Sequence, residues 1–226
     1  MTGWRTIGVI GGMGPAATAD FMRLLVNGAG ADQDSDHPRV IIDSNPQVPG
    51  RNAALAGTGP SPGPMLAETA RQLVAMGAEV LAMPCNAAHN WAPEVRAVAG
   101  ADFVDIVDAA IAEAMVHTPR TIGILAIGAT LDARLYNRAP VPVIAADRDR
   151  LQPLIDRIKA GDIGSQVAQA MATIAADLVA AGADVIIAAC TEVPLVLPAT
   201  AVPMPLIDTT AALARATLAA ARLSVR

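Results

Sequence analysis

The hydrophobic residues of the chain fall into short continuous runs that alternate with stretches of helical spacing. The runs lie at residues 6–10, 40–42, 80–83, 103–107 and 121–125. Continuous apolar runs of this length are typical of strands buried on both faces of a parallel sheet. Residues 15–26 and 65–76 predict helices, whereas the Pro- and Gly-rich residues 45–64 predict an irregular loop. The alternation predicts an α/β fold with mainly parallel sheets flanked by helices.

The second half of the chain repeats the pattern of the first. Residues 73–80 align without a gap with residues 178–185, and seven of the 15 positions that begin at residues 72 and 177 are identical. The same register places Cys85 on Cys190, and each cysteine directly follows a predicted strand. An internal duplication explains a match that keeps its order over several elements.

This duplication predicts two pseudo-symmetric domains with one cysteine each. We expect the first domain to comprise residues 1–117 and 208–226, and the second to comprise residues 118–207. Ligands of open α/β sheets bind outside the carboxyl ends of the strands. The active site is therefore expected in the cleft between the two domains.

Composition excludes several classes of protein. The 226 residues are 53% hydrophobic and 16% charged, which argues against disorder. A net charge of −5 and 2% aromatic residues argue against a nucleic-acid partner. The most apolar stretch, residues 193–207, is interrupted by prolines, so no membrane span is expected. The chain opens without a secretory signal pattern, and we expect a cytoplasmic protein.

The two cysteines are the sharpest chemical signal in the sequence. Taken singly, each is readily explained as a small buried hydrophobic residue. A disulfide is disfavoured in a reducing compartment, and a redox pair lacks the Cys-x-x-Cys spacing. Their equivalent positions in the two halves favour a two-base proton transfer, in which one thiolate removes a proton from a carbon and the opposing thiol returns one to the other face.

Such a mechanism makes demands on the neighbouring groups. A thiolate needs a lowered pKa, and we expect backbone amides at the strand-to-helix turns to provide it. A carbanion next to a carboxylate needs hydrogen-bond donors aimed at the carboxylate oxygens. Asn86 and Thr191, which directly follow the cysteines, are placed for that task.

Three segments resemble the aspartate/glutamate racemase family, in particular its aspartate racemase branch. They are residues 11–18 (GGMGPAAT), 84–89 (PCNAAH) and 190–195 (CTEVPL). The resemblance implies an isomerase that needs no cofactor or metal, is usually a homodimer, and acts on a small molecule with a carboxylate. Aspartate, glutamate or a related amino acid is the substrate class that it implies.

The resemblance also implies roles for individual residues. Cys85 and Cys190 match the acid/base pair, and Asn86 and Thr191 match residues that hold the α-carboxylate and amino group. Arg51 and Lys159 match the two cations that recognise a side-chain carboxylate. Apart from the resemblance, we expect Met13, Ala87 and Thr130 to line the substrate and His89 and Glu192 to support the site. A histidine at the start of a helix, such as His89, is also explained by hydrogen bonds to the backbone alone. Lys159 is also the single lysine among the 16 basic residues, which alone would leave a pyridoxal phosphate enzyme as a further interpretation, but no phosphate cradle accompanies it.

The chain departs from the family pattern near the expected site. Ala87 stands where the family usually has threonine, and Ile127, Gly50 and Ala189 also remove polarity or space. These changes keep two alternatives open. One is a relative with other chemistry, such as a hydantoin racemase, maleate isomerase or malonate decarboxylase; the other is a protein that binds a small acid without turning it over.

Overall fold

The computed structural model describes residues 3–223, so the ends of the first predicted domain, residues 1–2 and 224–226, lie outside it. The chain divides into two compact units, of which unit 1 comprises Met1–Ile106 and Thr210–Arg226 and unit 2 comprises Val107–Thr209. The sequence placed the first crossing after residue 117, whereas this division places it after residue 106. The helix at residues 106–116 accounts for the difference, because nearly all of it groups with unit 2.

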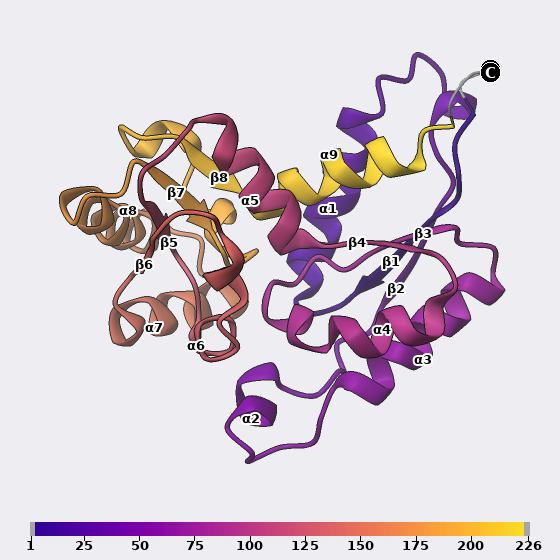
Figure 1. The fold of residues 1–226 in the computed structure, drawn as a ribbon, viewed down its shortest axis with the longest axis horizontal. Coiled ribbons are helices and arrows are strands. Elements are labelled where there is room, and N and C mark those ends of the chain that lie inside the picture. Colours follow the sequence, from indigo (N-terminus) through magenta and orange to yellow (C-terminus); the bar gives the residue numbers. More distant parts are fainter. Residues whose placement is uncertain (1–2, 224–226) are drawn as a thin grey trace. The chain divides into compact units, whose positions relative to one another are not determined.

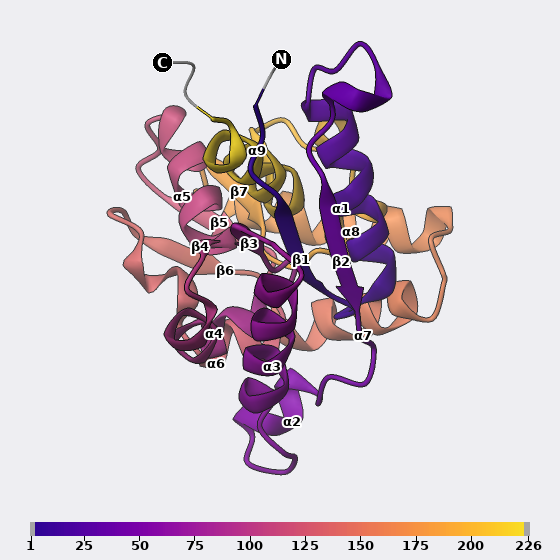
Figure 2. The same ribbon diagram turned by 90° about the vertical axis from the view of Figure 1, so that its right-hand side faces the viewer.

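Unit 1 is a parallel four-stranded sheet with helices on it. Its strands are β1 (Ile7–Gly11), β2 (Val40–Ser44), β3 (Val80–Ala82) and β4 (Asp102–Val104), in the order β2-β1-β3-β4. Its helices are α1 (Pro15–Gly28), η1 (Asp34–Asp36), α2 (Arg51–Leu55), α3 (Gly63–Ala75), η2 (Ala87–Trp91), α4 (Ala92–Ala99) and α9 (Thr209–Ala221). The C-terminal α9 returns to lie beside α1 (Figure 1), and the parallel pair β1 and β2 is seen from the side in Figure 2.

Unit 2 has the same plan. Its strands are β5 (Ile122–Ile124), β6 (Val143–Ala145), β7 (Val185–Ala188) and β8 (Leu206–Asp208), all parallel in the order β6-β5-β7-β8. Its helices are α5 (Ile106–Val116), α6 (Gly128–Asp132), η3 (Leu135–Arg138), α7 (Arg148–Lys159), α8 (Ser165–Ala180), η4 (Val193–Leu195) and η5 (Ala199–Ala201). Two parallel sheets flanked by helices confirm the predicted fold class.

The repeat seen in the sequence reappears as matching contacts in the two sheets. A Cβ added to Gly8 would lie 2.7 Å from the Cβ of Ala78, and one added to Gly123 would lie 2.9 Å from that of Ala183. Both distances are shorter than real Cβ contacts allow. In each unit, a glycine on the first strand therefore allows close approach of the turn that precedes the third strand.

A second matching pair of contacts lies at the amino end of the first strand of each sheet, where a carboxylate accepts a backbone N–H. The backbone N–H of Thr6 donates to Glu79 at 2.9 Å, and that of Thr121 donates to Asp184 at 3.2 Å. Asp184 also accepts the backbone N–H of Arg120, and this hydrogen bond is the main reason that the pKa of Asp184 is lowered. The repeat thus extends from the sequence to particular hydrogen bonds.

Two expectations about single elements need correction. The predicted loop at residues 45–64 contains α2 and the start of α3. The predicted strand at residues 103–107 ends at Val104, and α5 begins at Ile106. A short apolar run cannot distinguish a strand from the first turn of a buried helix, which explains the second error.

Helices of residues 3–223 are too short or too polar to span a membrane.

Candidate active site

A tight glycine turn follows β1 and holds Met13. The Thr18 hydroxyl accepts the backbone N–H of Gly12 at 2.8 Å and donates to the carbonyl of Gly14 at 3.1 Å. Gly12 has φ of +89°, and a Cβ there would come within 2.4 Å of the Asn45 backbone. Only glycine fits both constraints. Thr18 was not identified as a site residue from the sequence. Its place in the first turns of the helix that follows the glycine turn is the signal that could have identified it.

Arg51 begins α2 and reaches the same turn. Its guanidinium donates to the carbonyl oxygens of Val48 at 3.3 Å, Pro49 at 3.2 Å and Met13 at 3.4 Å. Among residues 3–223, no carboxylate lies within ion-pair distance of it. A half-buried guanidinium whose bonded partners are neutral carbonyl oxygens is suited to bind an anionic ligand.

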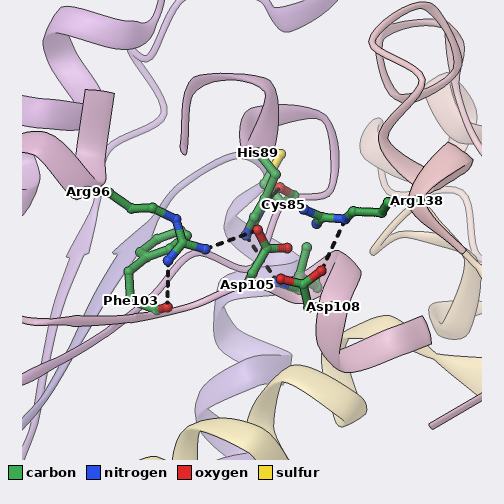
Figure 3. A network of polar contacts seen from close by, with 8 residues as sticks. Cys85, His89, Arg96, Phe103, Asp105, Asp108 and Arg138 are labelled. Carbon is green, nitrogen blue, oxygen red and sulfur yellow. Dashed lines mark hydrogen bonds and ion pairs between the residues drawn. The ribbon is translucent and has the colours of Figure 1, made fainter. Parts of the chain in front are cut away.

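Cys85 lies at the end of the strand next to β1. Cys85, Asn86 and Ala87 follow β3 and are each at most 5% exposed. Because β1 and β3 are neighbours, the glycine turn and this segment leave adjacent strand ends. His89 lies one turn further on, with Nδ1 2.9 Å from the carbonyl oxygen of Cys85 (Figure 3). Unit 1 thus places Met13, Arg51 and Cys85 at one edge of its sheet.

Cys190 lies at the equivalent strand end of unit 2, against a buried carboxylate. Its thiol donates to Oε2 of Glu192 at 3.0 Å, and the Thr191 hydroxyl donates to the same oxygen at 3.4 Å. All three residues are 4% exposed. Glu192, expected only as a supporting residue, is in direct contact with the sulfur.

The pKa of the Cys190 thiol is raised well above its ordinary value. Burial is the largest cause, and the negative charge of Glu192 is the second. The positive charge of Lys159 acts in the opposite direction. The backbone N–H of Glu192 lowers the pKa of Cys190, as expected, but this is the smallest contribution, and the causes that raise the pKa outweigh it. The helix that follows, η4, has three residues, too few to provide a strong dipole.

Lys159 and Thr130 complete the predicted set in unit 2. Lys159 ends α7, is exposed, and lies close enough for its charge to act on Cys190. Thr130 lies in α6, which follows β5, the neighbour of β7. Its hydroxyl is buried and finds no hydrogen-bond partner among the described residues. An unsatisfied buried hydroxyl costs free energy unless a ligand engages it.

No metal centre emerges from the part of the chain that the structure describes. It contains no group of three or more His, Cys, Asp or Glu side chains that could hold an ion.

Two α/β units of the same strand order, each with a cysteine at the carboxyl end of its third strand, define a two-domain fold of the racemase type. The chain belongs to the Asp/Glu/Hydantoin racemase family, whose model matches residues 10–217. The family of isomerases anticipated from the sequence is thereby confirmed.

Named relatives agree with this assignment. The broad specificity amino-acid racemase RacX of Bacillus subtilis is 27% identical over 222 residues, which cover 94% of this chain and 96% of that protein. The aspartate racemase of Picrophilus torridus has a TM-score of 0.86 and 26% identity, covering 97% of this chain and 96% of that one. Glutamate racemase of Francisella tularensis, at 18% identity and a TM-score of 0.67 over 93% and 78% of the two chains, shares the fold.

Proposed function

We propose that the protein is a cofactor-independent amino-acid racemase in which Cys85 and Cys190 are the two acid/base groups. The observation that carries the proposal is the equivalence of the two cysteines. Each is buried, each follows the third strand of its unit, and each is followed by a polar residue, Asn86 or Thr191. A reaction that exchanges one proton between two faces of a carbon needs one such group for each face.

The two cysteines have different roles at the start of the reaction, because one must donate a proton and the other must remove one. Cys190 begins as a thiol, since burial and the Glu192 carboxylate hold its proton. Cys85, as the base, removes the α-proton of one enantiomer, while Cys190 donates its proton to the opposite face. The product state has a Cys85 thiol and a Cys190 thiolate, which is the form that accepts the opposite enantiomer.

The polar groups around the cysteines suit a substrate with a carboxylate. The carbanion formed at Cα is stabilised when hydrogen-bond donors and cations are aimed at that carboxylate. Asn86 and Thr191 directly follow the cysteines in the chain, and the Thr130 hydroxyl, which has no partner among the described residues, offers a hydrogen-bond donor. Arg51 and Lys159 supply positive charge for a second carboxylate, which favours aspartate, glutamate or a related acidic amino acid.

The named relatives differ in breadth of substrate. One is called a broad specificity amino-acid racemase and the other an aspartate racemase. The apolar, buried side chains of Ala87 and Ile127 favour the broader alternative for this chain, because they offer no hydrogen bond to a substrate carboxylate.

A substrate panel tests the proposal. Each L- and D-amino acid is incubated separately with the protein, and the appearance of the opposite enantiomer is followed by chiral chromatography. We expect racemisation of at least one acidic or related amino acid. Hydantoins, maleate and substituted malonates form the second part of the panel. Turnover of these compounds alone would replace the proposed activity, and tight binding of a small acid without any turnover would indicate a binding protein.

A further inference from the structure

His89 connects the Cys85 segment to another part of unit 1. Its ring is 4% exposed, and it uses both nitrogens (Figure 3). Nδ1 lies 2.9 Å from the carbonyl oxygen of Cys85, and Nε2 accepts the backbone N–H of Ile106 at 3.1 Å. A single tautomer satisfies both bonds, the neutral ring with its proton on Nδ1.

The second partner of His89 is a special point in the chain. Ile106 is the first residue of α5, and the chain passes from unit 1 to unit 2 directly after it. The first N–H groups of a helix have no partner within the helix, and a buried one must find a partner elsewhere. His89 provides it and thereby ties the start of α5 to the backbone of Cys85.

The second crossing of the chain is tied in a similar way. The chain returns to unit 1 after Thr209, and the Thr209 hydroxyl donates to the carbonyl of Ala188 at 2.9 Å. Ala188 ends β7, two residues before Cys190. At both crossings, the first residue of the emerging helix is therefore tied to the strand end that carries the cysteine, through the His89 ring at the first crossing and by a direct hydrogen bond at the second.

Neighbouring side chains hold the His89 ring in place. The ring of Phe103 packs against it with centroids 5.5 Å apart. Arg96 lies 4.8 Å above the Phe103 ring and forms an ion pair with Asp105 at 3.2 Å (Figure 3). Asp105 directly precedes Ile106, so these contacts surround the same junction.

We propose that His89 is a positioning residue, which fixes Cys85 by bonding its carbonyl through Nδ1 and anchors it to the first residue of α5 through Nε2. The proposal rests on the function proposed above, because it assigns the effect of this bridge to the cysteine expected to act at Cα. His89 touches the backbone of Cys85 rather than the sulfur, so it acts through the position of that residue. Pro194 occupies the equivalent place in unit 2, and the bridge is therefore specific to Cys85.

Two substitutions separate the bonds of the ring. The amide of asparagine overlays Nδ1, so His89→Asn keeps a donor for the Cys85 carbonyl and loses the acceptor for Ile106. Glutamine reaches the Nε2 position, so His89→Gln keeps that acceptor and loses the donor. His89→Ala loses both, and His117→Asn, at an exposed histidine of α5's C-terminal end, is the matched control.

The readout is the alkylation rate of each cysteine by iodoacetamide, resolved by peptide mass spectrometry. We expect His89→Gln and His89→Ala to accelerate alkylation of Cys85 about tenfold, the equivalent of one buried hydrogen bond, with the rate of Cys190 unchanged. His89→Asn should show a similar acceleration, because it breaks the same bridge at Ile106, whereas the control should stay close to the unsubstituted protein. Thermal melting of the Asn and Gln variants ensures that folded proteins are compared.

Kinetics supply the second readout. His89→Gln should lower kcat by a similar factor with KM unchanged, since it displaces a proton-transfer group rather than a substrate contact. Equal acceleration at Cys85 and Cys190, or an unchanged Cys85 rate in either the Asn or the Gln variant, would overturn the proposal. Alkylation requires no turnover, so a protein without racemase activity would refute the proposed function while leaving the bridge measurable.

Discussion

The most informative residue is Cys190, because burial, a negative charge and a positive charge all act on the pKa of its thiol. Burial and Glu192 raise its pKa, and Lys159 lowers it. A thiol that resists ionisation is a poor base but a good proton donor. Burial and, after it, the Glu192 carboxylate thus favour Cys190 as the proton donor.

Glu192→Gln should make Cys190 react with iodoacetamide at lower pH. Removal of the negative charge takes away a cause that raises the pKa, so the thiolate forms earlier as pH rises. Lys159→Met should shift the pH–rate profile in the opposite direction. The profile of the Cys190 peptide, measured by mass spectrometry, checks both.

Asp177→Asn is the matched control for these variants. Asp177 lies in the same unit, is exposed, and pairs with Arg150 on the surface. Its substitution should leave the Cys190 profile in place. An unchanged pH–rate profile for Glu192→Gln would contradict the claim that Glu192 raises the pKa of Cys190.

Thr130→Val should separate stability from substrate binding. Valine has nearly the shape of threonine and removes a buried hydroxyl that has no partner among the described residues. We expect the free energy of unfolding to stay the same or to rise by up to about 1 kcal/mol, because no hydrogen bond is lost and a desolvated group is removed. If the hydroxyl binds substrate, KM rises about tenfold. A loss of stability in urea unfolding would instead indicate that the hydroxyl already has a structural partner.

At the scale of elements, the turns before β3 and β7 depend on glycine for their backbone conformation. Gly77 and Gly182 have φ of +99° and +98°, and a Cβ at Gly182 would meet nothing within 4 Å. The cost of a side chain at Gly182 is therefore conformational rather than steric.

Gly182→Ala should lower the free energy of unfolding by about 1–3 kcal/mol, the usual cost of a strained backbone conformation. Gly128→Ala in the same unit is the control, because φ there is not in the left-handed region and a Cβ would meet its nearest atom at 3.7 Å. Denaturant unfolding of both variants checks the difference. Equal stability of the two would mean that the turn relaxes to accept alanine.

Some strands and helices could be located from the sequence, and others could not. Continuous apolar runs located β1, β2, β3 and β5, since a strand buried on both faces needs apolar residues throughout. The start of α5 was missed because Ile106 and Val107 continue the apolar run of β4, and such a run does not distinguish a strand from the first turn of a buried helix. The contact of Glu192 with the sulfur of Cys190 likewise depends on rotamers that the sequence does not specify.

At the scale of the whole molecule, duplication explains why one chain carries two sheets of the same order. The repeat in the sequence predicted both sheets and the equivalence of the cysteines, and the paired contacts of Gly8 and Gly123 confirm it. The boundary between the units is harder to predict than the sheets. The chain crosses at the first residues of α5 and α9, and the sequence pattern does not show to which unit a helix that begins at a crossing belongs. The homodimer implied by the resemblance stays a prediction.

The most direct test of the central claim is proton exchange at Cα in D2O, measured by proton NMR for the protein and for Cys85→Ser and Cys190→Ser. The account predicts that the racemised product carries one deuterium at Cα, starting from either enantiomer. Each serine variant should lose racemisation by at least about a hundredfold, since each direction needs both an acid and a base. Racemisation at an undiminished rate by either serine variant, or product that retains its proton at Cα, would contradict the two-cysteine mechanism.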